Sequence, residues 1–184
     1  QEARRRGLLN LPTTVDALPR YLDQKNVELF TSHKIYTEAE MEARYETILE
    51  EYSKTLNIEA LTMSEMTRQD ILPAVSAYIA SLADAVASKR AIIAGLPCAA
   101  ETSLIQKLSG LLDSAYEKVE ALDALVTDGK ASEYDHNTLR VATYYKDKII
   151  PAMNSLRAVV DQMEVDTSAA FWPYPSYGDL MFRV

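Results

Sequence analysis

The residue types that most often do chemistry in proteins are sparse in this chain. His33 and His136 are the only histidines and Cys98 is the only cysteine, so the closed nitrogen and sulfur site of a structural zinc ion cannot be completed. A carboxylate metal site inside a helical bundle would need inward-facing Glu-x-x-His pairs on facing helices. Glu133 and His136 have that spacing, but His33 has no such partner. The pattern therefore supplies at most half a site.

The common catalytic and phosphate-binding motifs are also absent. The strings HExxH, DxDxDG, GxGxxG, GxxxxGKS/T and GxSxG do not occur, and these are typical of zinc, calcium, dinucleotide, nucleotide and nucleophile-elbow sites. Many carboxylates occur between residues 38 and 51, but their regular spacing is typical of a solvated helix face. Cys98 follows Pro97 among apolar residues, which favours a buried packing role over a reactive thiolate. The sequence thus predicts no catalytic, cofactor-binding or metal-binding residue in this chain.

Composition and charge exclude several classes of protein. The chain has 19 Lys and Arg against 27 Asp and Glu, a net charge of -8, which is the wrong sign for a nucleic-acid-binding surface. The longest uncharged apolar stretch, residues 71–83, is shorter than the roughly 20 residues that span a bilayer, so no membrane contact is expected. A lone cysteine permits no intrachain disulfide and favours a cytoplasmic location. Of the 184 residues, 48% are hydrophobic and 25% charged, which is typical of one soluble folded domain.

Helical periodicity dominates the chain, whereas the alternation typical of strands is absent. Residues 1–56 predict a connector broken by prolines and then a first helix, which begins at the capping box of Thr37 and Glu40. Asn57 is expected to cap a second long helix, which ends at Gly95. The first of these helices places on one apolar stripe Met41, Tyr45, Ile48, Leu49 and Tyr52.

Two further helices and two internal prolines complete the expected fold. A third helix is expected to end at Gly129 and to place on one apolar stripe Leu104, Leu108, Leu111, Ala115, Val119, Leu122 and Val126. Ser132 with Asp135 is expected to cap a fourth helix. The strings DILPAV at residues 70–75 and DKIIPAM at residues 147–153 each place a proline inside a helical stripe, which predicts a kink. The fold class is therefore all-α, an antiparallel bundle of three to four long helices, two with proline kinks, and an irregular aromatic tail. We divide the chain into residues 1–56, a bundle over 57–170 and a docking tail over 171–184.

The tail collects aromatic residues, two prolines and a glycine in a stretch that cannot form a regular helix. Such a segment must pack against something or leave an apolar patch exposed. Two interpretations stay open, since the tail can fold back on its own bundle or anchor the chain to another domain or subunit. The residues that we expect to make interdomain or subunit contacts are Trp172, Tyr174, Tyr177, Leu180 and Phe182.

Four strings of the chain together resemble one known family. They are LNLPTTVDALPRYL at residues 9–22, NIEALTMSEM at 57–66, DILPAVSAY at 70–78 and WPYPSYGDLMF at 172–182. Over essentially its whole length the chain resembles the C-terminal region of type III glutamine synthetases. Leu11, Pro12, Ala17 and Leu18 also resemble the string with which glutamine synthetase catalytic domains approach their final helices. Residues 1–56 are accordingly expected to include the end of the catalytic fold.

The resemblance implies a parent enzyme that makes glutamine from glutamate, ammonia and ATP, with Mg or Mn ions held by an earlier catalytic domain. It carries over no catalytic, nucleotide or metal residue to this chain, and implies a structural or oligomerisation role. The implied partners are the catalytic domain of the same polypeptide and neighbouring subunits of a large homo-oligomer. Because the first residue is Gln rather than Met, we expect a longer native polypeptide. The alternative is a free-standing helical adaptor or regulatory bundle that binds a partner protein through the aromatic tail.

Overall fold

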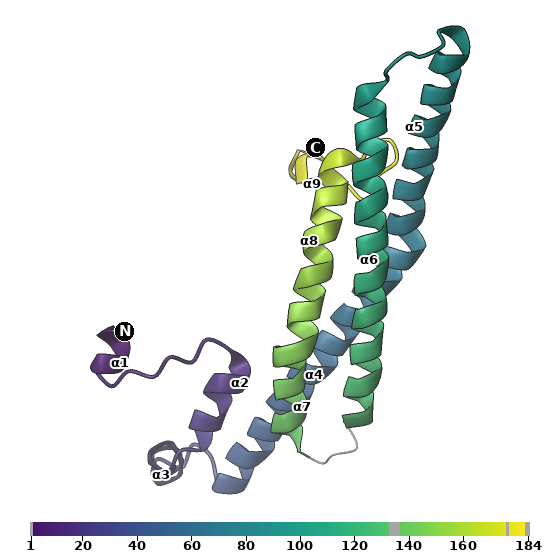
Figure 1. Ribbon diagram of the computed structural model, residues 1–184. Coiled ribbons are helices and arrows are strands. Elements are labelled where there is room, and N and C mark those ends of the chain that lie inside the picture. Colours follow the sequence, from purple (N-terminus) through teal and green to yellow (C-terminus); the bar gives the residue numbers. More distant parts are fainter. Residues whose placement is uncertain (1, 133–136, 176, 183–184) are drawn as a thin grey trace. The chain divides into compact units, whose positions relative to one another are not determined.

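The computed structural model describes residues 2–132, 137–175 and 177–182, and over these ranges the chain is helical and contains no strand (Figure 1). The prediction of an all-α fold is confirmed. The chain divides into two compact units, which are residues 1–58 with 127–150 and residues 59–126 with 151–184. The division of the sequence at residues 56 and 170 stays a prediction.

Short helices precede the long ones. The first part of the chain holds α1 (Glu2–Arg5), α2 (Thr14–Ala17), the 3-10 turn η1 (Leu18–Leu22) and α3 (Gln24–Ser32). The long helices are α4 (Glu38–Met66), α5 (Leu72–Ile92), α6 (Ala99–Ser132) and α8 (Ile150–Asp166), and the short α7 (Thr138–Tyr144) precedes α8. Two π-helical turns, η2 (Thr67–Ile71) and η3 (Tyr145–Ile149), join α4 to α5 and α7 to α8, and α9 (Tyr177–Met181) follows in the tail.

The start of α4 was predicted correctly, but the expected break at Asn57 was wrong. Thr37 and Glu40 form the capping box, because the Glu40 N–H donates to Thr37 Oγ1 at 3.3 Å and the Thr37 N–H donates to Glu40 Oε2 at 2.7 Å. Asn57 instead lies inside α4, and its Oδ1 accepts a hydrogen bond from the Tyr145 hydroxyl at 3.3 Å. A tertiary partner therefore takes the side chain that the sequence assigns to a helix cap.

Gly129 does not end the third long helix. It is buried within α6, and a Cβ at this position would lie 3.1 Å from Cε1 of Tyr144. Its lack of a side chain permits the close approach of that ring, a role that a sequence pattern for helix ends does not reveal. The correction to the prediction is thus that this glycine serves packing rather than a left-handed turn.

The start of α7 is capped by a residue that the sequence analysis did not choose. Asn137 Oδ1 accepts the backbone N–H of Arg140 at 3.0 Å. Of the predicted cap, Asp135 and the side chain of Ser132 lie outside the described part of the chain. Asn is among the best capping residues because its short side chain reaches the free N–H groups of the first turn.

Each of the two prolines predicted to kink a helix follows a π-helical turn. In η2 the Leu72 N–H bonds the carbonyl of Thr67, five residues back, and Pro73 comes next. Pro151 follows η3 in the same way. A proline inside an α-helix clashes with the carbonyl four residues back and removes one hydrogen bond. A wider turn just before the ring changes the position of that carbonyl, so the helix continues past the proline.

An apolar cluster and an ion pair between α2 and η3 hold the first unit together. Lys146 Nζ, which lies in η3, contacts Asp16 Oδ1 of α2 at 2.8 Å. The Lys146 ammonium lowers the pKa of Asp16, and the Asp16 carboxylate raises the pKa of Lys146. The cluster has buried Val15, Leu49 and Ala142 at its centre and half-buried Leu18, Tyr45, Tyr52 and Leu139 around it.

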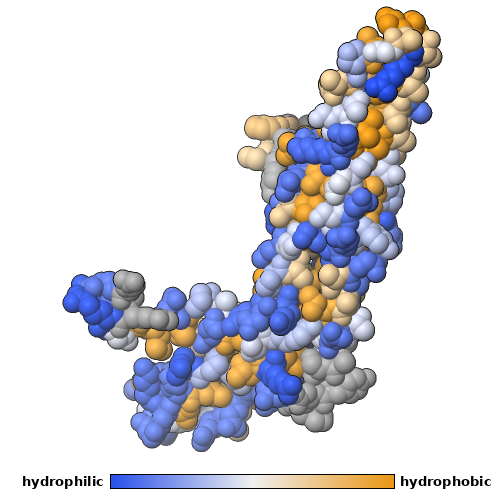
Figure 2. Space-filling model, in the orientation of Figure 1, coloured by the Kyte–Doolittle hydropathy of each residue, from blue (hydrophilic) through white to orange (hydrophobic). Residues whose placement is uncertain are grey.

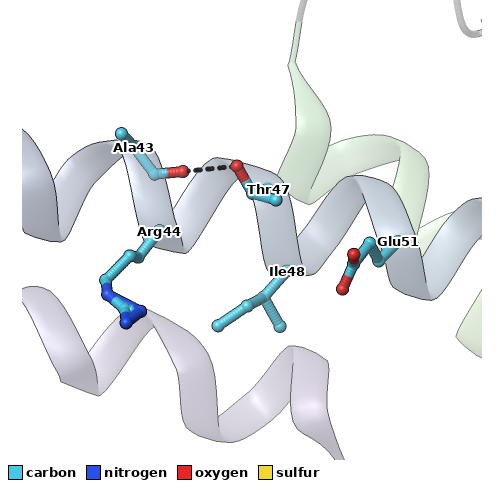
Figure 3. A pocket seen from close by; sticks show the side chains of 5 residues that line it. All are labelled: Ala43, Arg44, Thr47, Ile48 and Glu51. Carbon is cyan, nitrogen blue, oxygen red and sulfur yellow. Dashed lines mark hydrogen bonds between the residues drawn. The ribbon is translucent and has the colours of Figure 1, made fainter.

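Ile48 departs from the predicted apolar stripe of the first helix. Its side chain is 39% exposed, whereas Met41 and Leu49 on the same helix are fully buried. Ile48 lies in an open hollow of about 330 Å³ on α4, where Figure 3 shows its side chain on the same side of the helix as Arg44. This surface is therefore partly apolar.

The second unit contains antiparallel helices. Lys107 near the start of α6 pairs with Asp166 at the end of α8 at 2.5 Å, and further along α6 Lys118 donates to Ser155 of α8 at 2.7 Å. Because the residue numbers of the contacts increase along α6 while those of their partners decrease along α8, the two helices are antiparallel. The predicted apolar stripe of α6 is confirmed in this unit by the buried residues Leu108, Ala115, Val119, Leu122 and Val126.

The helical stretch Glu38–Ile92 is more apolar than the sequence analysis assumed. It contains an 18-residue window with a mean hydropathy of 1.5, of which 11% is buried, so by length and composition alone it is long enough to cross a membrane. An 18-residue window is longer than the uncharged stretch of residues 71–83, which ends before Asp84. A single helix of this kind is weak evidence, since core helices also meet the criterion. Figure 2 shows hydrophobic residues at the turn between α5 and α6.

Candidate docking site in the C-terminal tail

The tail begins with a tight turn at the end of α8. The backbone N–H groups of Phe171 and Trp172 both donate to the carbonyl of Ser168, at 2.8 and 3.1 Å. Thr167, just before it, is buried and donates its hydroxyl to the carbonyl of Met163 at 2.6 Å. The direction in which the chain leaves α8 is therefore fixed by hydrogen bonds.

The first aromatic residues of the tail pack on their own unit. The ring of Phe171 lies 5.2 Å from that of Tyr78 on α5, at 46° between the ring planes, a geometry worth about 0.5–1.5 kcal/mol beyond the area it buries. Trp172, next in the chain, is half-buried. This half of the tail follows the interpretation in which it folds back on the bundle.

Tyr174 fastens the tail to the π-helical turn η2. Its hydroxyl donates to Asp70 Oδ2 at 2.6 Å. Burial raises the pKa of Tyr174 to about 12, with a further contribution from the hydrogen bond to Asp70. Both effects favour the neutral phenol, because the charged form would lose solvation and face a carboxylate. The hydroxyl is therefore a hydrogen-bond donor at any physiological pH.

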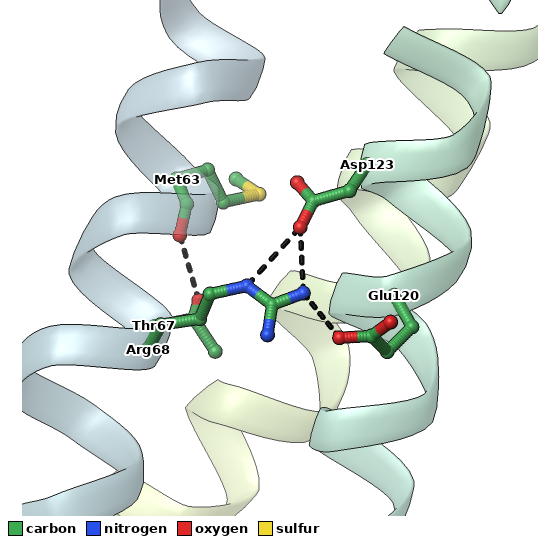
Figure 4. Close-up of polar contacts among 5 residues, drawn as sticks. All are labelled: Met63, Thr67, Arg68, Glu120 and Asp123. Atoms are coloured by element: carbon green, nitrogen blue, oxygen red, sulfur yellow. Dashed lines mark hydrogen bonds and ion pairs between the residues drawn. The ribbon is translucent and has the colours of Figure 1, made fainter. Parts of the chain in front are cut away.

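The turn that receives Tyr174 is itself fixed to α6. Arg68 contacts Asp123 Oδ2 through Nη2 at 2.6 Å and Nε at 3.1 Å, and Glu120 Oε1 at 2.5 Å (Figure 4). These carboxylates, Glu120 first, raise the pKa of the Arg68 guanidinium. Thr67 Oγ1 donates to the carbonyl of Met63 at 2.7 Å. Asp70, which bonds Tyr174, thus lies in a turn that the contacts of Thr67 and Arg68 hold in place.

The last part of the tail is exposed among the residues that the structure describes. Leu180, Met181 and Phe182 at the end of α9 are 64%, 73% and 79% exposed. Three neighbouring large apolar residues at this exposure are typical of an interaction surface rather than of scattered surface residues. The tail therefore has a fixed first half and an uncovered apolar end.

The chain is similar to known proteins along its whole length. The glutamine synthetase C-terminal domain family matches residues 1–90. A glutamine synthetase of Butyrivibrio fibrisolvens is 35% identical over 184 residues, 100% of this chain and 26% of that protein. A type-3 glutamine synthetase of Dictyostelium discoideum is 31% identical over 98% of the chain and 25% of its own length, and a glutamine synthetase of Bacteroides fragilis is 27% identical over 99% and 25%. Residues 1–90 of the chain belong to the glutamine synthetase C-terminal domain family. The chain spans about a quarter of the length of these curated relatives.

The five residues predicted for interdomain contact fall into separate groups in this glutamine synthetase domain. Trp172 and Tyr174 are half-buried on their own unit, and Leu180 and Phe182 are exposed. The side chain of Tyr177 lies outside the described part of the structure. Their contact with another domain stays a prediction.

Sequence reasoning missed the residues that receive the tail. Asp70 and Tyr78 lie eight residues apart on one helical stretch, and two turns of an α-helix carry roughly this many residues. That spacing puts a carboxylate and an aromatic ring near one face of the helix. The string DILPAVSAY contains both residues, but it indicates the tail contact only once the tail is known to lie beside it. The partner Phe171 was included in the tail but not chosen as a contact.

The described residues offer no place for a metal ion. No group of three or more His, Cys, Asp or Glu side chains within that part of the chain is arranged to hold one. Glu133 and His136, the half-site of the sequence analysis, lie outside the described residues. We therefore assign no metal ligand among the described side chains.

Proposed function

We propose that this chain is the C-terminal structural domain of a type III glutamine synthetase, located in the cytoplasm. The parent enzyme would make glutamine from glutamate, ammonia and ATP, using Mg or Mn ions. The chemistry would lie in the polypeptide outside this chain, which is about three quarters of the length of the relatives. Similarity to a type-3 enzyme over 98% of the chain supports this assignment.

In this proposal the tail anchors the antiparallel helices to the catalytic body or to a neighbouring subunit of a homo-oligomer. The observation that carries it is the exposed apolar end formed by Leu180, Met181 and Phe182 on a tail whose base is fixed. Each of these side chains would contribute about 1.5–3 kcal/mol if fully buried on binding. A fixed base lowers the entropy lost on docking, so more of this contribution remains as binding free energy.

The first experiment measures the intact mass of the native polypeptide, captured from the source cells with an antibody against this domain. A mass several-fold above 20.6 kDa, with ATP-dependent glutamine formation by the captured material, is the expected result. A mass near 20.6 kDa would overturn the proposal and favour the helical adaptor that binds a partner protein.

The docking role is tested in the full-length enzyme with Phe182→Asp and Leu180→Asp. We expect a smaller assembly by light scattering and lower glutamine formation, because a charge in an apolar contact must be desolvated without a partner. Val165→Asp is the matched control, since Val165 is 83% exposed on α8 of the same unit. Trp172→Ala should weaken the assembly to a lesser degree. If the tail variants keep the wild-type size and activity, the tail is not the anchor.

A further inference from the structure

The last turn of α8 contains a buried carboxylate oxygen. Asp166 is the final residue of this helix, its Oδ2 atom is buried, and no hydrogen bond reaches that atom within the described part of the chain. The same turn includes Glu164 and no basic residue. The C-terminal end of a helix bears a partial negative charge, and a buried charge is costly unless it is paired. Asp166 therefore needs a cation from another element.

Lys107 on α6 provides that cation. Its Nζ lies 2.5 Å from Asp166 Oδ2, and Figure 1 shows α6 and α8 side by side. The side chain of Lys107 is 55% exposed, whereas that of Asp166 is 19% exposed. The two partners are therefore unequal. An unpaired Lys107 would be solvated where it lies, but an unpaired Asp166 could reach water only by moving.

The base of the tail follows this carboxylate directly in the chain. The Thr167 N–H donates to the carbonyl of Met163 at 2.9 Å, and the N–H groups of Phe171 and Trp172 donate to the carbonyl of Ser168. Movement of Asp166 into water would unwind the last turn of α8, because the neighbouring Thr167 is bonded within that turn. Ser168 would then no longer fix the direction in which the tail leaves the helix. The pairing of Asp166 and the position of the tail are thus coupled.

We propose that the positive charge of Lys107 is a latch for the C-terminal tail. While the ammonium group faces Asp166, the tail stays docked on its own unit, with the ring of Phe171 on Tyr78 and the hydroxyl of Tyr174 on Asp70. When that charge is lost, the last turn of α8 opens and the tail leaves its unit. The ring contact and the hydrogen bond form only when the base holds the tail close to its partners, because each is weak by itself.

The latch goes beyond the proposed function, since it concerns how the tail is held on its own unit rather than what its apolar end binds. The anchor is tested at Leu180 and Phe182 by assembly size, whereas the latch is tested at Lys107 and Asp166 by local opening. Failure of one proposal therefore leaves the other untouched.

Amide hydrogen exchange of the full-length protein, followed by mass spectrometry of peptides that cover residues 167–172, tests the latch. Lys107→Gln removes the charge, and exchange in this segment should rise about tenfold, because a buried acceptor without its partner bears its full desolvation cost. Lys107→Arg retains the charge and should exchange at the wild-type rate. Lys118→Gln is the matched control, because Lys118 joins the same two helices through the uncharged Ser155 Oγ at 2.7 Å.

The partner variant separates the latch from an ordinary surface ion pair. Asp166→Asn removes the buried charge and leaves Lys107 exposed to water, so the tail should stay docked. The double variant Lys107→Gln with Asp166→Asn should exchange as slowly as Asp166→Asn alone. A double variant that opens as much as Lys107→Gln would overturn the proposal, since the lysine would then act through a group other than Asp166.

Chymotrypsin cleavage after Phe171 measures whether the tail itself leaves. The bond is protected while the Phe171 ring packs on Tyr78, so Lys107→Gln should raise the cleavage rate about tenfold, in step with the exchange. Faster exchange without faster cleavage would show a frayed helix end under a docked tail, and would overturn the latch. An equal rise in exchange over residues 152–163 of α8 would show general unfolding and would also overturn it. Unaltered exchange in Lys107→Gln would contradict the proposal directly.

Discussion

Two glycines on α6 should respond differently to the same substitution. A Cβ at Gly110 would meet no atom within 4 Å, whereas a Cβ at Gly129 would lie 3.1 Å from Cε1 of Tyr144 and 3.6 Å from Oη of Tyr145. Gly110→Ala should therefore stabilise the chain. Gly129→Ala should leave its stability unchanged or lower it.

The size of the difference follows from two terms. Replacing a helical glycine by alanine stabilises a helix by about 0.5–1 kcal/mol, because alanine loses less backbone entropy on folding. At Gly129 the Tyr144 ring must shift by a few tenths of an ångström, and overpacking of this kind costs about 1–3 kcal/mol. The free energies of unfolding of the two variants should thus differ by about 1–3 kcal/mol, with Gly110→Ala the more stable.

Urea unfolding of the 184-residue chain, followed by far-ultraviolet circular dichroism, measures this difference. A Tyr144→Ala background provides the control, because the cost of Gly129→Ala should disappear when the ring is removed. Equal stabilisation by the two alanines would refute the close-approach explanation for Gly129. A cost that persists without the Tyr144 ring would refute it as well.

Three further predictions concern the polar contacts. In an alkaline titration followed by tyrosinate absorbance, Tyr174→Phe should remove the ionisation near pH 12. Because the pKa of Tyr174 is raised, the hydrogen bond from the tail to Asp70 is complete below about pH 10 and is lost as the pH rises through about 12. The lowered pKa of Asp16, caused first by the hydrogen bond from Lys146, means that its contact is complete above about pH 3.9 and is lost as the pH falls through the lowered value. Amide exchange of α2, corrected for the intrinsic effect of pH, should rise in that acid range, and Asp16→Asn should remove the change; exchange that is unaltered in the variant would contradict it. Arg68→Met should lower the free energy of unfolding by about 1 kcal/mol, against less than about 0.5 kcal/mol for Arg157→Met. The reason is that Arg68 contacts two carboxylates, whereas Arg157 contacts the exposed Asp161. Equal losses in urea unfolding would show that the contacts of Arg68 with α6 add no more stability than an exposed ion pair.

The features predicted correctly from sequence depend on neighbouring residues. The capping box of Thr37 and Glu40 closes within one turn, so the residue types alone determine it. The buried stripe of α6 follows from helical periodicity, which holds wherever one face packs. The turn near Gly95, where φ is +81°, follows because a left-handed backbone favours glycine.

The features that sequence reasoning missed depend on partners far along the chain. Asn57 is a residue type that often caps helices, but its side chain bonds Tyr145, which lies 88 residues further along the chain. Gly129 is a residue type that often ends helices, but its role is determined by the ring of Tyr144 on the next helix. The sequence predicted that the aromatic tail packs against something, but only the positions of Asp70 and Tyr78 decide which of its aromatic residues pack on their own unit.

The two π-helical turns also affect how relatives of this chain should be aligned. A π-helical turn is equivalent to one residue inserted into an α-helix, and removing that residue restores ordinary α-helical hydrogen bonding without breaking the helix. Deletion of a single residue should therefore be tolerated at 67–71 and at 145–149. Elsewhere in these helices, one added residue would rotate every following side chain by about 100° around the axis. Gaps in alignments of this domain belong at the two turns, even where residue identity alone would place them in a loop.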